Sequence, residues 1–550
     1  MSGQAKVLLV TMKNGVGFNI APQVAVYQLR HYLTDHGIDC EIFDRDIAEP
    51  ESFIGKTREG AYAVIGFSVS SQNMEDDLDL IWRFRFAVKN SPQSCIIVTG
   101  GAEATMNYKQ WLELGSDIIL TGFAEKSLYQ FCRNVLGAPL EKGEPFDFES
   151  LTEGVNGYAY CKQDGTAIYN PSPIINYDVF RELFFERILT IDIPYQAYWK
   201  KVNEIIADFD HGRADFVIEN ARVYTSSHCP RKCGFCNAQS FIPFSQGKES
   251  PIIMLTAEEV EQLLFMYIER FGARSFLFSD DDFVIGSKLG LERVEKLCNR
   301  IIELKKTSLI PAETLFFCQS RVRGLMKKSG RDGAKANLEL LSLMQKAGFK
   351  SIGLGVETYS ERLLKAPSVN KIGVSRDDCL MVIDAILGLG MVPMTNIILG
   401  IPENTVEELT DTVEVVLEYL KKGCDVSVNG VMRASHGAPA MESRKYDFTL
   451  RKWSHPVNGE EAEIADFFIP QNPEMKKIVT NFDIVARKEL DFVVKNHGWE
   501  GKIIHKTVLG MVNLLSIAKL IDDPDLISRC QTTLSESIEQ VSASQLSQLD

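Results

Sequence analysis

Short apolar segments alternate with amphipathic helices across residues 221–431, and this alternation constrains the fold more than any other feature of the chain. Thr256 and Glu259 form a capping-box pattern that predicts the start of one helix. Further helices are expected at 289–305, 337–347, 375–389 and 405–421. Strands are expected at 221–224, 275–279, 315–319, 351–356, 394–399 and 425–431. Strands that alternate with helices in this way predict a parallel α/β sheet closed into a partial (β/α)6 barrel of the TIM type.

A second alternation occupies residues 1–140. Apolar, β-branched strands are expected at 6–11, 39–43, 63–67, 95–99 and 117–121, with helices between them. This pattern predicts a doubly wound, Rossmann-like α/β domain, whose ligand site lies beyond the carboxyl ends of its strands. The residues at three of those ends are Ser68 and Ser70, Gly100 and Gly101, and Gly122 and Glu125. Paired glycines at such a place let a bulky ligand approach the backbone closely.

Three cysteines, Cys229, Cys233 and Cys236, follow the first strand of the predicted barrel in a C-x-x-x-C-x-x-C pattern. Three thiolates this close together can converge on one metal centre, and an iron–sulfur cubane held by only three leaves one iron open to a small molecule. The alternatives are an ordinary loop or a zinc site. Zinc sites usually take paired C-x-x-C units with a fourth Cys or His, and the chain has no second C-x-x-C. The pattern favours an iron–sulfur cluster.

Size, charge and cysteine usage limit the remaining possibilities. A chain of 550 residues is too long for one core and is expected to hold about three domains. It has no run of 18 apolar residues and no signal segment at Met1, so we expect a cytoplasmic protein without a membrane span. The other nine cysteines are scattered singly, which is typical of reduced thiols. The net charge of −15, with no Lys/Arg-rich segment, argues against nucleic acid and favours a small-molecule or peptide substrate.

The cysteine pattern resembles that of the radical S-adenosylmethionine (SAM) superfamily, and the preceding domain narrows the resemblance to its cobalamin-binding members. That resemblance implies a [4Fe-4S] cluster on Cys229, Cys233 and Cys236, with SAM chelating the free iron. It also implies that the nucleotide tail of cobalamin lies among Ser68, Ser70, Gly100, Gly101, Gly122 and Glu125. The chain departs from the family pattern in having Glu103 where His is frequent and Phe123 where Glu is common. It also lacks the Asp-x-His-x-x-Gly motif whose His ligates cobalt.

The same resemblance implies a SAM site at the ends of the barrel strands. Phe235 stands where the superfamily places an aromatic residue near the adenine, and Asp280, Asp281 or Asp282 would hold the amino group. Carboxylates suit an ammonium ion, although a solvated acidic turn is the alternative for all three. The resemblance further implies Glu357 for the ribose, and Gly400, Ile401 and Pro402 for the adenine. Ser320 and Arg321 end the third strand, and because Arg matches carboxylates in a bidentate manner, Arg321 would bind the methionine carboxylate of SAM or the substrate. A surface ion pair explains Arg321 equally well.

The predicted domains are a cobalamin-binding Rossmann-like domain at 1–140, an aromatic-rich connecting region at 141–210 and the radical SAM barrel at 211–431. Residues 432–550 are expected to form a mostly helical domain that closes the substrate site, with a polar tail from about residue 531. In this family that region is the most divergent part. Its candidate substrate contacts are Arg433, His436, Tyr446, Trp453 and His455, each of which has an ordinary structural role as the alternative.

Together these features predict a cobalamin-dependent radical SAM enzyme that C-methylates a small molecule or peptide, using methylcobalamin and a 5′-deoxyadenosyl radical. An external one-electron donor such as flavodoxin or ferredoxin would reduce the cluster. The same architecture would also support cyclisation or ring rearrangement, non-radical methyl transfer, or transfer of another SAM group. A cobalamin and iron–sulfur sensor is a further alternative, but the sequence has no recognisable DNA-binding helix-turn-helix or basic patch.

Overall fold

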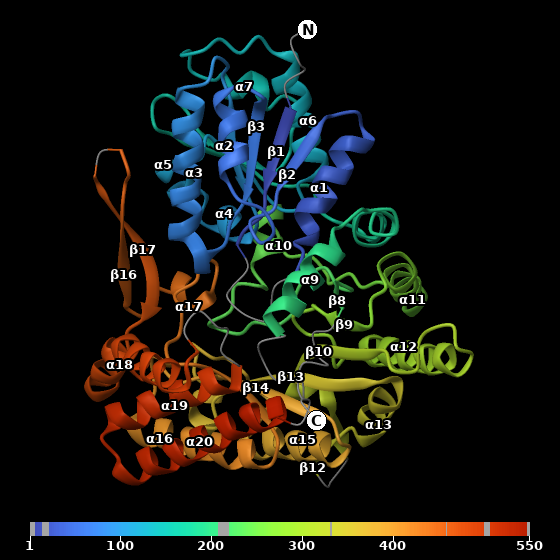
Figure 1. Cartoon of the computed structure of the whole chain (residues 1–550), viewed down its shortest axis with the longest axis vertical. Helices are drawn as coiled ribbons and strands as arrows, with labels where there is room; N and C mark the ends of the chain where they lie inside the picture. The colour runs from blue at the N-terminus through green and yellow to red at the C-terminus, as the bar shows by residue number, and fades with distance from the viewer. Residues whose placement is uncertain are drawn as a thin grey trace.

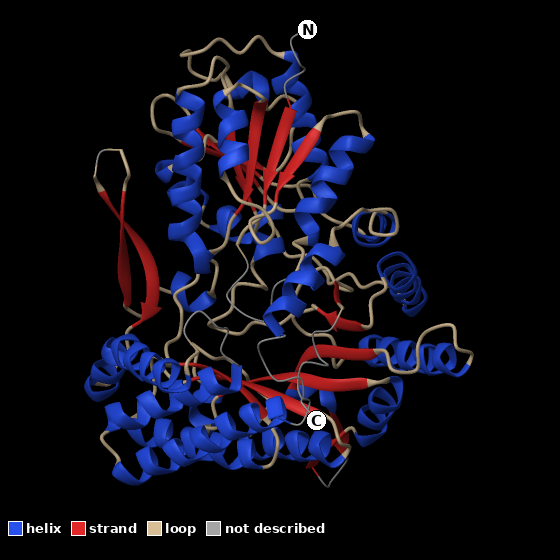
Figure 2. Cartoon of the chain, viewed as in Figure 1, coloured by secondary structure: helices blue, strands red, loops and turns tan. Residues whose placement is uncertain are grey.

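The computed structural model describes residues 6–13, 21–206, 219–329, 333–457, 459–499 and 506–546. Two β-sheets dominate the molecule, one in each lobe (Figures 1 and 2). The upper sheet has the strand order β2-β1-β3-β4-β5-β6-β7, in which β1 to β5 are parallel and β6 and β7 continue antiparallel. Its strands are β1 (Lys6–Val10), β2 (Cys40–Phe43), β3 (Tyr62–Ser68), β4 (Ile96–Gly100), β5 (Ile118–Leu120), β6 (Tyr158–Cys161) and β7 (Ala167–Asn170).

Helices cover both faces of this sheet, as predicted for a doubly wound domain. Leu8 and Val10 of β1 belong to the core on one face, whereas Val7 and Leu9 belong to the core on the other. Burial on both faces explains why the parallel strands are continuous apolar runs in the sequence. The helices are α1 (Val24–Asp35), α2 (Glu51–Arg58), α3 (Met74–Lys89), α4 (Ala102–Met106), α5 (Tyr108–Leu114), α6 (Glu125–Gly137) and α7 (Phe148–Leu151).

The second sheet has six strands in the order β15-β14-β13-β10-β9-β8, all of them parallel. This arrangement confirms the predicted partial barrel. Its strands are β8 (Asn220–Val223), β9 (Ser275–Phe278), β10 (Leu315–Arg321), β13 (Phe349–Glu357), β14 (Val392–Ile398) and β15 (Asp425–Asn429). A small hairpin of β11 (Met326–Ser329) and β12 (Gly333–Ala336), which the sequence pattern did not predict, follows β10.

Helices connect the barrel strands, and the capping box predicted at Thr256 and Glu259 is present. They are α10 (Phe241–Gln246), α11 (Ala257–Met266), α12 (Lys288–Lys306), α13 (Leu338–Ala347), α14 (Glu361–Leu364), α15 (Arg376–Gly388) and α16 (Val406–Lys421). Helices α8 (Tyr177–Arg181) and α9 (Tyr195–Ile206) lie between the two lobes (Figure 1). None of the helices described combines the length and apolar character that a bilayer crossing requires.

The C-terminal region is mostly helical, with α17 (Pro439–Glu442), α18 (Pro473–His497), α19 (Lys506–Ile521) and α20 (Pro524–Leu546). It also contains an unpredicted hairpin of β16 (Phe448–Ser454) and β17 (Glu461–Phe468). The predicted polar tail from residue 531 is helical as far as Leu546, since α20 continues through it.

Two predicted boundaries differ from the structure or fall outside it. The upper sheet does not end near residue 140, because β6 and β7, within the predicted connecting region, pair with it up to Asn170. The boundary predicted between residues 210 and 211 lies outside the described residues.

Candidate active site

A cavity of about 540 Å³ opens at the carboxyl ends of the upper strands. Apolar side chains such as Leu9, Val26 and Leu128 line its part within the upper domain. The six residues predicted at the strand ends all lie on its wall: Ser68, Ser70, Gly100, Gly101, Gly122 and Glu125. The structure therefore brings this part of the predicted site together at one place.

Two of these glycines are required by the backbone. Gly101 has φ of +104°, and a Cβ there would lie 3.2 Å from the Val69 carbonyl oxygen. Gly122 has φ of +68°, and a Cβ would lie 2.7 Å from the Ser172 hydroxyl. Side chains at these positions would be both strained and crowded. The strand ends thus present bare backbone to the cavity.

Buried polar atoms without partners mark the cavity as a site for a polar ligand. Ser70 Oγ, Glu103 Oε2 and Glu125 Oε2 are buried and have no hydrogen-bond partner among the described residues. Burial raises the pKa of Glu125 to about 7. Such atoms are rare in folded proteins because each loses its hydration without compensation. A ligand with several hydrogen-bonding groups and an apolar body fits this wall.

A second cavity, of about 320 Å³, adjoins the first between the two lobes. The seven residues that line both are Met12, Gln23, Ala25, Gln28, Phe123, Phe184 and Tyr224. Ser226, Ser227 and His228, which directly precede Cys229, also line the second cavity, as does Asp281. The first cavity therefore adjoins a second one that borders the residues directly before the cysteine loop.

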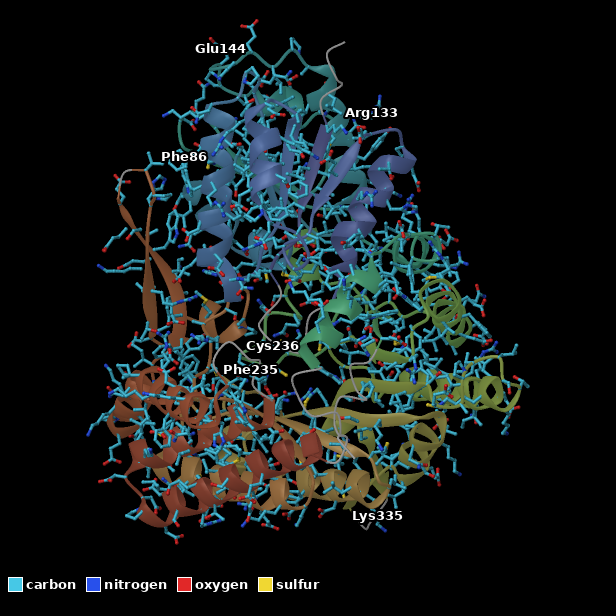
Figure 3. The ribbon with its side chains drawn as sticks, in the orientation of Figure 1. Phe86, Arg133, Glu144, Phe235, Cys236 and Lys335 are labelled. Carbon is cyan, nitrogen blue, oxygen red and sulfur yellow. The ribbon has the colours of Figure 1, made fainter. Side chains whose placement is uncertain are left out.

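The cysteine loop is fixed by backbone contacts on both sides. Gly234 N donates to the Val369 carbonyl at 3.2 Å, and Ala440 N donates to the Gly234 carbonyl at 2.8 Å. Gln239 Nε2 donates to the carbonyls of Cys233 and Cys236 at 3.0 and 3.2 Å. Figure 3 shows Phe235 and Cys236 near the junction of the two lobes.

The three cysteines are half-buried and carry no disulfide. Burial raises the pKa of Cys229 to about 12 and of Cys236 to about 11, and neighbouring thiols contribute: Cys236 to the shift of Cys229 and Cys233 to that of Cys236. The described residues contain no group of three or more His, Cys, Asp or Glu side chains arranged around a single metal ion. Three thiols in a C-x-x-x-C-x-x-C pattern can supply three ligands of a cubane cluster.

The three aspartates after β9, Asp280, Asp281 and Asp282, have different surroundings. Asp280 accepts hydrogen bonds from Thr225 N at 2.9 Å and Thr225 Oγ at 2.6 Å, so its carboxylate is already occupied. Asp282 pairs with Arg231 Nε at 2.8 Å and accepts from Arg321 N at 3.1 Å. Asp281 accepts no hydrogen bond from any described residue and faces the second cavity. Although its side chain is exposed, desolvation by the surrounding protein, followed by repulsion from Asp280 and Asp282, raises its pKa to about 6.

Glu357 and Arg321 lie at the carboxyl ends of adjacent barrel strands. Glu357 has φ of +69°, a strained conformation for a residue with a side chain. It is buried and accepts from Lys371 Nζ at 2.7 Å, a partner that the sequence pattern did not reveal. The Arg321 guanidinium forms no ion pair with the described residues. Ser320 Oγ donates to Asp282 Oδ1 at 3.2 Å.

The Gly400–Pro402 turn follows β14, as predicted. A Cβ at Gly400 would lie 2.8 Å from the Gly430 carbonyl, so this glycine allows the ends of β14 and β15 to approach. The Pro402 carbonyl accepts from Gln471 N at 2.8 Å. Ile401 is fully buried in a small apolar cluster against which Phe235 packs. The structure thus brings Phe235 and Ile401 to the same place.

The five candidate substrate contacts of the C-terminal region have partners within the chain. Arg433 pairs with Asp466, Tyr446 with Glu403 and His436 with Glu103. Trp453 donates to Asp79, and His455 packs edge-on against Trp82. These side chains therefore support contacts within and between domains, which was the structural alternative for each.

Comparison with known proteins agrees with this architecture. The B12-binding domain model matches residues 15–131, and the radical SAM superfamily model matches residues 223–416. No curated protein sequence matches the chain.

Solved structures of other proteins share the fold of this chain. The cobalamin-dependent SAM radical enzyme OxsB, with aqua-cobalamin bound, superposes with a TM-score of 0.62 at 13% identity, over 98% of this chain and 84% of its own. The radical SAM methyltransferase TsrM from Kitasatospora setae, with cobalamin and a [4Fe-4S] cluster bound, gives 0.60 at 13% identity, over 96% and 100%. TsrM with tryptophan substrate and a SAM analogue gives 0.58 at 14%, over 84% and 86%. Identities this low show a shared fold.

A B12-binding domain followed by a radical SAM domain defines this chain as a cobalamin-dependent radical SAM enzyme, as its sequence predicted. The cofactors of that class are a [4Fe-4S] cluster, SAM and cobalamin. The cavity with unpartnered polar atoms and the three neighbouring thiols fit these groups.

Proposed function

We propose that this enzyme is a methyltransferase that adds a methyl group to a carbon atom of a small molecule or peptide. The shared wall of the two adjoining cavities carries the proposal. Seven residues line both, so a group held at the upper strand ends can meet a substrate held next to the cysteine loop. The shared fold with two cobalamin-binding radical SAM proteins, one of them a methyltransferase, supports it.

In this proposal the upper domain holds the tail of cobalamin by its strand ends. The unpartnered oxygens of Ser70 and Glu125 accept hydrogen bonds from the cofactor, and the bare backbone at the glycines lets it approach. Ser68 has a second task, because its Oγ accepts from Gln23 Nε2 at 2.6 Å. The residues proposed for the tail site are Ser68, Ser70, Gly100, Gly101, Gly122 and Glu125.

The barrel holds the cluster and SAM. The thiolates of Cys229, Cys233 and Cys236 would hold the cluster, and SAM would bind beside it. Asp281 is the carboxylate we propose for the SAM ammonium group, because Asp280 is occupied by Thr225 and instead fixes the end of β9.

The other barrel residues complete the proposed SAM site. The unpaired Arg321 guanidinium suits the SAM carboxylate, and Ser320 keeps Asp282 in place beside it. Phe235 and the turn Gly400, Ile401 and Pro402 border the adenine, and Glu357 binds the ribose through the oxygen that Lys371 leaves free.

If bound, the cluster and SAM would supply radical chemistry, and cobalamin would supply the methyl group, which would come from a second SAM molecule. The protein itself would bind and orient the substrate and the cofactors, and it would exclude water from the site. Phe123, Phe184 and Tyr224 form an aromatic boundary between the two cavities. An external one-electron donor such as flavodoxin or ferredoxin is proposed to reduce the cluster.

The proposal is tested by incubating reconstituted enzyme with hydroxocobalamin, a chemical reductant and SAM carrying a deuterated methyl group. We expect the protein-bound cobalamin to gain the labelled methyl and SAM also to be cleaved to 5′-deoxyadenosine. Cleavage without any labelled cobalamin would contradict methyl transfer and favour cyclisation or ring rearrangement. Labelled cobalamin without 5′-deoxyadenosine under reducing conditions would contradict the radical step and favour the non-radical route.

A further inference from the structure

The segment that follows β15 is joined to the C-terminal hairpin. Arg433 pairs with Phe467 in an antiparallel bridge. Ala434 N donates to the Asp466 carbonyl, and Phe468 N donates to the Met432 carbonyl, both at 2.9 Å. Residues 432–434 therefore pair with β17 as a short third strand-like segment of the hairpin. The hairpin and this segment, which we call the clasp (residues 432–468), make one unit.

The clasp packs on the barrel through Met432, Ala440 and Tyr446, and its hairpin also docks on the upper domain. Trp453 is 4% exposed and belongs to the same hydrophobic core as α3, and its Nε1 donates to Asp79 Oδ1 at 2.9 Å. Gln110 Nε2 of α5 donates to the Glu463 carbonyl of β17 at 2.7 Å. Figure 1 shows the hairpin rising beside α3 from the C-terminal helices. Segments more than 300 residues apart are thus held together.

The base of the clasp reaches the wall of the cobalamin cavity. His436 Nδ1 donates to Glu103 Oε1 at 3.2 Å, and Asn107 Nδ2 donates to the same oxygen at 3.1 Å. The contact is tight, because a Cβ on Gly437, whose φ is +81°, would lie 2.2 Å from Met106 Sδ. His436 is therefore held directly against α4, at the end of β4.

The second oxygen of Glu103 has no partner. Glu103 is 4% exposed, its Oε2 forms no hydrogen bond with the described residues, and the residue lines the cavity. An ionised carboxylate only accepts hydrogen bonds, so the missing partner is a donor. None of the polar side chains that line the cavity donates to this oxygen, and the peripheral carboxamide groups of cobalamin carry N–H donors that suit it.

We propose that Glu103 binds a carboxamide of cobalamin through Oε2 while His436 holds Oε1, so that cobalamin binding and docking of the clasp stabilise each other. The inference rests on cobalamin occupying the first cavity, as in the proposed function. His436 is a positioning residue here, since it acts through Glu103. Because linkage is reciprocal, cobalamin must tighten the clasp by the same factor by which the docked clasp tightens cobalamin binding.

The test uses the full chain and hydroxocobalamin, with equilibrium dialysis for Kd and hydrogen–deuterium exchange for the clasp. We expect Glu103→Gln to weaken cobalamin binding about tenfold, because a charged hydrogen bond is lost in a buried site. His436→Ala should weaken it several-fold, and His436→Gln, which keeps a donor, should recover part of the loss. In the wild type, cobalamin should slow exchange in residues 432–437, and His436→Ala should remove this protection.

Glu442→Gln is the matched control. Glu442 accepts from Gly437 N at 3.3 Å on the exposed side of the same segment and does not line the cavity. The Kd of the Glu442→Gln variant for hydroxocobalamin should therefore equal that of the wild type. Wild-type affinity in both Glu103→Gln and His436→Ala would overturn the proposal, as would cobalamin protection that stops at the strand ends. A wild type that binds no cobalamin would refute the occupancy of the cavity itself, which is a different failure.

Discussion

Replacing Gly234 with Ala should prevent the cysteine loop from closing. A Cβ at this position would lie 2.1 Å from the Pro367 carbonyl oxygen and 2.5 Å from that of Ser368. Both neighbours are backbone atoms, so relief requires the whole loop to move by roughly 1 Å, which also breaks the bond from Gly234 N to Val369. Overpacking costs about 1–3 kcal/mol and a lost hydrogen bond about 1 kcal/mol.

A total of about 3 kcal/mol lowers the population of the closed loop by roughly two orders of magnitude, since each 1.4 kcal/mol is tenfold. The assay is iron content and cluster absorbance after anaerobic reconstitution, with cobalamin binding measured on the same sample. We expect Gly234→Ala to lose most of its iron and to keep cobalamin. Gly388→Ala is the matched control, because no atom lies within 4 Å of its added Cβ. Full iron occupancy in Gly234→Ala would refute the reasoning.

Three further predictions follow from the site. Lys371→Met should destabilise the fold by about 3–5 kcal/mol, because it leaves Glu357 buried without its partner; a Glu357→Gln change in the same chain should recover part of the melting temperature, and no recovery would contradict the pairing. Asp281→Asn should weaken SAM binding in equilibrium dialysis without lowering the melting temperature, whereas Asp280→Asn should lower the melting temperature. A lower melting temperature in Asp281→Asn, together with weaker SAM binding in Asp280→Asn, would contradict the assignment of Asp281 to the SAM ammonium group. Burial raises the pKa of Glu125 from its ordinary 4.5 to about 7, so the cofactor-free protein loses stability as pH rises from about 4.5 to 7; Glu125→Gln should raise its melting temperature at pH 8 but not at pH 4, and an equal effect at both would contradict this.

The barrel strands were predictable from their alternation with amphipathic helices, although β8, β14 and β15 largely alternate between buried and half-buried residues. The parallel strands of the upper sheet were predictable because they are buried on both faces. Such strands are short apolar runs, and the helices between them keep their periodicity and caps. The β16–β17 hairpin was not predicted, because most of its side chains are exposed or half-buried and its apolar–polar alternation is interrupted after four residues in each strand. Its apolar side chains are also divided between clusters, since Trp453 and Ile464 belong to the upper core and Phe468 belongs to a cluster on the barrel.

Within the site, the sequence predicted residues that follow strands but not how their side chains are shared. Asp280 and Asp281 are neighbours in the chain, and only the fold shows that Thr225 occupies the first and leaves the second facing a cavity. Lys371 lies 14 residues beyond Glu357, and no motif connects the two. His436 had been expected to contact substrate, but its partner is Glu103, 333 residues earlier.

The proposed function requires that one chain hold two cofactors, the iron–sulfur cluster and cobalamin, at two separate sites. Anaerobic reconstitution with iron, sulfide and hydroxocobalamin, followed by metal analysis of the desalted wild type and Cys233→Ala, tests this directly. We predict about four irons and one cobalt per wild-type chain, and loss of the iron with full retention of cobalt in the variant. A wild type with iron but no cobalt, or a variant that loses both metals, would contradict the account.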